Sequence, residues 1–171
     1  MDTNKSSIQL LCQKLQSNNN AQILEAIQKI RNHGDVSLIP FLLNVYVTNS
    51  DSIIQKSVAE CLYDIKNPLA APVFIEALAN KDFINAQIVV LQAMWQSGID
   101  YSKYADSFIH ILIHSDFETA IEAFSVIDSC AETIDVALRN SLCETLIKAS
   151  EKALSPHKDL LLQTVDLLQN V

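Results

Sequence analysis

The sequence contains only two glycines and four prolines among its 171 residues. A β-sheet protein needs many turns, and glycine and proline are the residues that form most of them, so an all-β fold is excluded. The remaining composition is rich in Ala, Leu, Ile, Gln, Glu and Lys, which favour helices. A chain of this length can bury about 70% of its unfolded surface, so the sequence predicts an all-α domain that folds without metal or disulfides.

The chain also lacks long apolar runs and paired cysteines. No segment reaches the roughly 18 to 20 apolar residues that span a bilayer, and no basic stretch followed by an apolar one opens the sequence. The four cysteines form no Cys-x-x-Cys motif, and no histidine lies at zinc-finger spacing. Cys12, Cys61 and Cys143 lie in apolar helical segments, so these three are expected to be small core residues in a reducing compartment. We therefore expect a cytoplasmic protein without metal or cofactor.

Positive charge is scarce as well. The formal net charge is −8, and between residues 100 and 135 eight acidic residues face a single base, Lys103. A protein that binds nucleic acid needs basic side chains that displace counterions from phosphates. Direct binding of DNA or RNA is therefore disfavoured.

A short phrase occurs three times in the chain, at spacings of 32 and 34 residues. Each copy opens an apolar helical segment that is followed by a polar loop ending at an aspartate. Self-similarity at this period is typical of stacked helical repeats, in which each unit leaves an apolar face for its neighbour to cover. The three copies are Ile39-Pro40-Phe41-Leu42-Leu43, Ala71-Pro72-Val73-Phe74-Ile75 and Ala105-Asp106-Ser107-Phe108-Ile109.

Aligned on this phrase, the chain is predicted to form a single domain, 1–171, of about five antiparallel helix pairs. Asp51, Asp82 and Asp116 precede the second helix of their pairs, where a carboxylate accepts hydrogen bonds from free backbone N–H groups. The end pairs fit the pattern less closely, as expected for terminal repeats. The predicted pairs cover about 7–33, 38–66, 71–97, 104–131 and 134–170.

The boundary between the second and third pairs carries a resemblance to a known family. Residues 59–78, AECLYDIKNPLAAPVFIEAL, resemble the repeat boundary of HEAT proteins, especially the PBS-lyase-like type. The resemblance implies a right-handed, armadillo-like α-solenoid, and it is strong for fold and weak for function. The sequence departs from the family where Ile54-Gln55 replaces a valine–arginine step and where Tyr63 and Lys66 replace glycines.

In such a stack the second helices line the concave side. Spacing predicts that their core positions are Ile23, Ala26, Ile27, Ile30, Ile54, Val58, Leu62, Ile65, Ala86, Val90, Met94, Ala120, Phe124 and Ile127. An exposed stripe is left at i, i+4, i+7. It contains Leu24, Gln28 and Arg31, then Lys56, Glu60 and Tyr63, then Ile88, Gln92 and Trp95, then Glu122, Val126 and Ser129.

This stripe is the predicted binding surface for a protein or peptide. Tyr63 and Trp95 occupy the same repeat position, and aromatic rings in a groove are frequent binding anchors. Glu118 and Glu122 add carboxylates that suit a basic, partly apolar partner. Two plainer interpretations stay open: both rings cover the end of the core, and the acidic stretch is a solvated surface. The predicted partner-binding residues are Tyr63, Trp95, Lys56, Glu60, Gln92, Glu118 and Glu122.

No catalytic site is predicted. His110 and His114 share a helix face, but the glutamate of a His-Glu-x-x-His zinc helix is absent, so they are interpreted as surface residues. Glu118 and Glu122 lack the closed pocket that paired catalytic acids need. The sequence thus predicts a non-catalytic scaffold or adaptor, monomeric or weakly dimeric through the apolar run at 160–162. The alternative, implied by the resemblance, is a subunit related to bilin lyases that helps attach a chromophore to its carrier protein.

Overall fold

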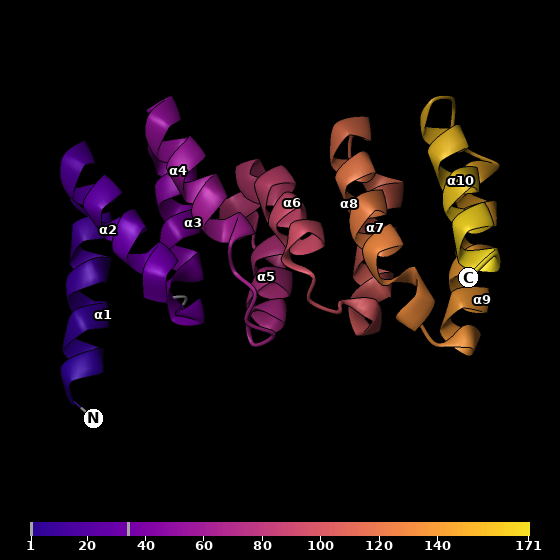
Figure 1. Cartoon of the computed structure of the whole chain (residues 1–171). Helices are drawn as coiled ribbons and strands as arrows, with labels where there is room; N and C mark the ends of the chain where they lie inside the picture. Colours follow the sequence, from indigo (N-terminus) through magenta and orange to yellow (C-terminus); the bar gives the residue numbers. More distant parts are fainter. Residues whose placement is uncertain (1, 34) are drawn as a thin grey trace. The chain divides into compact units, whose positions relative to one another are not determined.

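The computed structural model describes residues 2–33 and 35–171, with side chains over 7–32 and 35–171. Across these residues the chain forms α-helices joined by short loops and 3₁₀ turns, without a strand (Figure 1). The all-helical prediction is confirmed. The chain divides into two compact units, Met1–Ser97 (unit 1) and Gly98–Val171 (unit 2), which are described separately.

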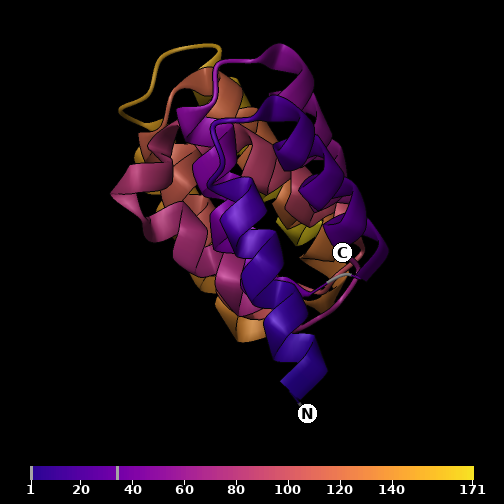
Figure 2. The same cartoon turned by 90° about the vertical axis from the view of Figure 1, so that its left-hand side faces the viewer.

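In unit 1 the six helices pack in consecutive pairs, the first on the second, the third on the fourth and the fifth on the sixth. The first helix of each pair also contacts the first helix of the next, and α4 contacts both α2 and α6, so the second helices lie side by side (Figures 1 and 2). The helices are α1 (Asp2–Leu15), α2 (Asn20–His33), α3 (Ile39–Thr48), α4 (Ser52–Tyr63), α5 (Ala70–Ala79) and α6 (Gln87–Ser97).

Unit 2 repeats this arrangement with four helices. Here α7 packs on α8 and α9 on α10, while α7 also contacts α9 and α8 contacts α10. The fully buried ring of Tyr101 meets Phe108 edge-on, with 6.2 Å between ring centroids. The helices are α7 (Ala105–His114), α8 (Phe117–Cys130), α9 (Val136–Ser150) and α10 (His157–Gln169).

Two of the three predicted aspartate caps are confirmed. Asp51 accepts a hydrogen bond from Ile53 N and Asp116 accepts one from Thr119 N. The prediction for Asp82 is wrong, because Asn80 is the cap and Asp82 donates its own backbone N–H to it. The reason is local: a 3₁₀ helix, η2 (Lys81–Ala86), starts there and places a non-helical residue, Phe83, before α6.

The predicted core is confirmed almost throughout. All its members are buried except Phe124, which is half-buried. Val126, predicted to be exposed, has 0% of its surface accessible. The buried positions recur with one spacing along three second-helix segments: Ile54, Val58, Cys61, Leu62 and Ile65; Ala86, Val90, Ala93, Met94 and Ser97; Thr119, Ala123, Val126, Ile127 and Cys130.

This spacing corrects the alignment of α8 by one residue. We compare the buried phenylalanine of each first helix with the first buried residue after the loop that follows that helix. Thr119 is 11 residues after Phe108, whereas Ala86 is 12 residues after Phe74. Asp128 therefore takes the repeat position of Tyr63, and Ile121 takes that of Lys56. Glu122 therefore does not occupy a repeat position equivalent to Lys56, Glu60 or Tyr63.

Candidate functional site

The exposed side of α2, α4 and α6 in unit 1 is linked from repeat to repeat by polar side chains. Arg31 on α2 donates through Nε to Asp64 Oδ2, and its Nη1 lies 3.4 Å from Glu60 Oε2. Asp64 raises the pKa of Arg31 chiefly through this hydrogen bond. Because Asp64 directly follows α4 and Glu60 lies on it, Arg31 joins the C-terminal ends of two neighbouring second helices.

The next two second helices, α4 and α6, are joined by a hydrogen bond between uncharged side chains. The Tyr63 hydroxyl on α4 donates to Gln92 Oε1 on α6 at 2.6 Å. Arg31 and Tyr63 are both 29 residues before their acceptors, Glu60 and Gln92. The same repeat position therefore contacts the same position of the following repeat in both cases. Tyr63 is thus held by α6 and is half-buried.

Lys66 adds a second link between the end of α4 and α6. Its Nζ donates to Gln96 O at 2.5 Å and to Tyr63 O at 3.1 Å. Gln96 lies in the last turn of α6, where carbonyl groups have no partner within the helix and a positive charge is favourable. The residue that replaces a family glycine therefore serves as a cap for the neighbouring repeat.

The predicted binding residues of unit 1 differ in their contacts and in their exposure to solvent. Tyr63 and Gln92 are brought together by their hydrogen bond, and Glu60 is next to Arg31. Lys56 is exposed, and 39% of the Trp95 surface is accessible. The structural roles of Asp64 and Lys66 were missed by the sequence analysis. The 32-residue spacing between Arg31 and Tyr63 was the available signal.

In unit 2 the two glutamates that were predicted to bind a partner lie on α8. Glu118 is exposed and Glu122 is half-buried, and both are on the same side of the helix. The pKa of the nearby N-cap Asp116 is lowered, mainly by the hydrogen bond from the Thr119 backbone. The N-terminal part of α8 thus presents the carboxylates of Asp116, Glu118 and Glu122 together with the exposed side chains of Phe117 and Ile121.

The two histidines on α7 form a stacked pair. Their ring centroids are 4.3 Å apart, and His114 Nδ1 lies 2.9 Å from His110 O. Over the residues with described side chains, no group of three or more His, Cys, Asp or Glu is placed to hold a metal ion. The pair itself therefore offers at most two ligands on one exposed helix face.

Shallow pockets lie within each of the two units. The pocket in unit 1, about 460 Å³, is bordered by the amide side chains of the loops before α2 and α4. In unit 2 one of about 380 Å³ lies beside His114, Lys148 and Lys152, and another of about 370 Å³ lies beside Asp128 and Glu132. None of them borders Tyr63, Trp95 or Glu122.

Comparison with known families accounts for the repeated helix pairs. A family model for HEAT repeats matches residues 8–95, just over half of the chain. The chain belongs to the HEAT-repeat family. The match covers the helix pairs of unit 1, and α8 of unit 2 has the same burial spacing as the HEAT helix α4.

HEAT repeats generally act as scaffolds for protein interaction, and the all-helical stack described above agrees with an α-solenoid. No curated protein matches this HEAT-repeat chain. Among the described residues, no helix is both long enough and apolar enough to cross a membrane.

Proposed function

We propose that this HEAT-repeat protein is a non-catalytic adaptor that binds a protein or peptide along the exposed sides of its second helices. In unit 1 the surface is formed by Lys56, Glu60, Tyr63, Gln92 and Trp95. In unit 2 the corresponding surface is formed by Glu118 and Glu122. The observation that carries the proposal is Trp95, a large amphipathic side chain with 39% of its surface exposed on a helix that otherwise packs well.

The contacts around Tyr63 support a preorganised surface. Its hydroxyl is fixed by Gln92 and the backbone around it by Lys66, so the ring loses little freedom when a partner binds. Side chains that are ordered before binding avoid an entropy cost of about 0.5–1.5 kcal/mol each. The proposal therefore assigns Tyr63 a fixed wall of the site and Trp95 the anchor.

The proposal includes a PBS-lyase-like, right-handed stack of five antiparallel pairs. The recurrence of one burial pattern in α4, α6 and α8 supports it, because helices at equivalent positions of a repeat bury equivalent residues. The acidic excess supports a basic partner. The free cysteines support a reducing, cytoplasmic setting.

The contacts of basic side chains in unit 1 disfavour the bilin-lyase alternative. A tetrapyrrole site would need basic side chains for the propionates. Arg31 already contacts Asp64 and Glu60, and Lys66 already donates to two backbone carbonyls. We therefore favour the adaptor.

The test is affinity capture followed by measurement with the purified partner. We expect Trp95→Ala and Glu122→Lys each to weaken binding at least ten-fold, since truncated anchors cost about 2 kcal/mol or more. Leu69→Ala is the matched control, because Leu69 is also exposed and apolar but lies outside the second helices. Circular dichroism checks that each variant is folded. Binding that is unchanged in both test variants contradicts the proposal. The proposal is also contradicted if bilin mixed with the purified protein shows a shifted absorption band that Trp95→Ala removes.

A further inference from the structure

Unit 2 has a second exposed surface, the α8–α10 face, which deepens the proposed function and rests on it. The face combines the middle and end of α8 with the outward side of α10, and the two helices contact each other. Asp159, Leu162 and Asp166 follow the i, i+3, i+7 spacing of one helix side. The face consists of Ile121, Asp128, Glu132, Asp159, Leu162 and Asp166.

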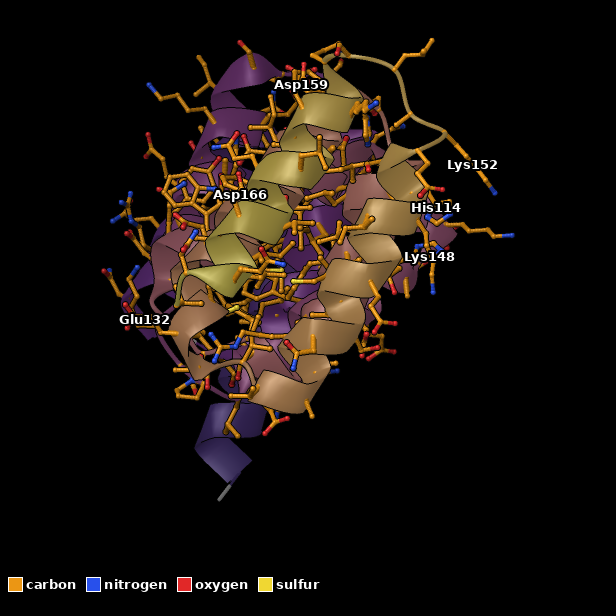
Figure 3. The ribbon with its side chains drawn as sticks, turned by 90° about the vertical axis from the view of Figure 1, so that its right-hand side faces the viewer. His114, Glu132, Lys148, Lys152, Asp159 and Asp166 are labelled. Atoms are coloured by element: carbon orange, nitrogen blue, oxygen red, sulfur yellow. The ribbon has the colours of Figure 1, made fainter. Side chains whose placement is uncertain are left out.

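Charge is distributed unequally around unit 2. The unit contains twelve acidic and five basic residues. In Figure 3 the labelled carboxylates of Glu132, Asp159 and Asp166 lie to one side, while His114, Lys148 and Lys152 lie to the other. Two bases lie at this face: Lys158 is exposed on α10, and Arg139 donates to Val171 O. The four carboxylates of Asp128, Glu132, Asp159 and Asp166 outnumber them, so the α8–α10 face keeps an excess of negative charge.

A pocket of about 370 Å³ lies at one end of this face. Its wall includes the acidic Asp128 and Glu132 and the apolar Leu167 and Val171. The pocket also borders Cys130, the last residue of α8, and the C-terminal end of a helix carries a partial negative charge. A lysine or arginine suits such a site, since its methylene stem packs on apolar surface while its charged end reaches the carboxylates.

The face also exposes apolar surface between its carboxylates. Ile121 and Leu162 each have 40% of their surface accessible. An amphipathic partner that buried these side chains would gain about 25 cal/mol for each Å² of apolar surface removed from water.

We propose that the α8–α10 face docks a basic amphipathic segment of a protein partner. Apolar residues of the segment cover Ile121 and Leu162, and one lysine or arginine enters the pocket beside Asp128 and Glu132. The charge complementarity selects this occupant. Polyanions and anionic membranes are repelled by the same carboxylates.

The experiment titrates the full chain into a fluorescently labelled amphipathic peptide of lysine and leucine and follows anisotropy. The same peptide with glutamate in place of lysine is the control ligand. The test variant is Asp128→Asn with Asp166→Asn, which keeps side-chain shape and removes two charges. The control variant is Glu144→Gln, an exposed carboxylate on α9 outside the face.

We expect the lysine peptide to bind, the glutamate peptide not to bind, and the double variant to bind about five-fold more weakly, as two exposed charge pairs imply. Glu144→Gln should bind as the unchanged chain does. Added salt should weaken binding of the lysine peptide.

The inference is overturned if the lysine peptide fails to bind, if both peptides bind equally, or if the double variant binds as tightly as the unchanged chain. Concentration-dependent self-association in sedimentation that Lys148→Glu abolishes would also overturn it, by assigning the face to a second copy. If the captured partner depends on Trp95 and Glu122 but not on Asp128 and Asp166, the proposed function stands and this inference falls.

Discussion

Unit 1 and unit 2 are built from the same helix pairs but use their polar residues differently. Unit 1 has seven basic and eight acidic residues, whereas unit 2 has five and twelve. In unit 1 these side chains connect successive helices, as Lys14 with Glu25 on α2 and Arg31 with Asp64 do. In unit 2 the contacts between repeats include His157 Nε2, which lies 2.5 Å from Leu112 O, and Thr133 Oγ1, which donates to Asp100 Oδ1.

The difference teaches how one repeat type can serve stability and recognition. Side chains that bond to the next repeat fix the stack, but they are less available to a partner. Carboxylates that face solvent contribute little to stability, and they attract a basic ligand. We therefore assign rigidity to the polar side of unit 1 and charge selection to that of unit 2.

The largest expected effect tests whether the two units unfold together. Phe74 in unit 1 and Phe108 in unit 2 are both fully buried at equivalent positions of their first helices. Replacing either with alanine should lower the free energy of unfolding by about 3–5 kcal/mol through lost burial and a cavity. Calorimetry should show one lowered transition if the units are coupled. A single variant that splits the transition would show that they unfold separately.

The helix caps give the next largest effect. Asp51→Ala and Asp116→Ala should each cost about 1–2 kcal/mol in chemical denaturation, since both carboxylates accept a backbone N–H. Asp51 also accepts from Asn20 Nδ2 at 2.9 Å. Asn20→Ala should therefore be additive with Asp116→Ala and less than additive with Asp51→Ala. Equal additivity in both double variants would contradict the link between repeats in unit 1.

A smaller effect is expected for the hydroxyl of Tyr63. Tyr63→Phe removes its hydrogen bond to Gln92 but keeps the ring, so stability should fall by about 0.5–1.5 kcal/mol. Partner affinity should stay within about two-fold if the ring forms the wall of the site. Isothermal titration of the captured partner measures the second quantity. A large loss of affinity would instead assign the hydroxyl to binding.

The smallest expected effect is a difference between the two units in how salt changes the pKa of a carboxyl group. Hydrogen bonds from Lys14 and then Lys29 lower the pKa of Glu25 to about 2. The Asp100 pKa is lowered first by the backbone N–H of Ser102. In 1 M salt, where screening acts over about 3 Å, the Glu25 pKa should rise towards 4.5 and that of Asp100 should change less.

Carboxyl carbon shifts in an NMR titration measure both values. Because the folded pKa of Glu25 is depressed, the stability contributed by its ion pairs is present above about pH 4.5. It is lost as the pH falls towards about 2. Equal salt responses of the two carboxyls would contradict the contrast between ion pairs and backbone hydrogen bonds.

Much of the fold could be predicted because apolar spacing survives in a helix whatever surrounds it. Ile54, Val58 and Leu62 were identified as core from their spacing alone, and they are buried. The register of α8 could not be predicted, because it depends on the length of the loop before it. Val126 was consequently placed on the exposed stripe that Asp128 occupies.

The candidate site was predictable in position but not in its contacts. Trp95 was expected to be exposed on α6, and it is. The partners of Tyr63 and Arg31 were not foreseen, because each bond crosses about 30 residues of sequence and needs two helices to lie side by side.

The sequence by itself determined the helical repeats, their core and the concentration of acid in the second half, since composition and periodicity are local properties of the chain. Only the tertiary structure decided which polar side chains bond across repeats and which face solvent. A difference of one residue in a loop rotates a helix by about 100°. That rotation decides whether valine or aspartate reaches the surface.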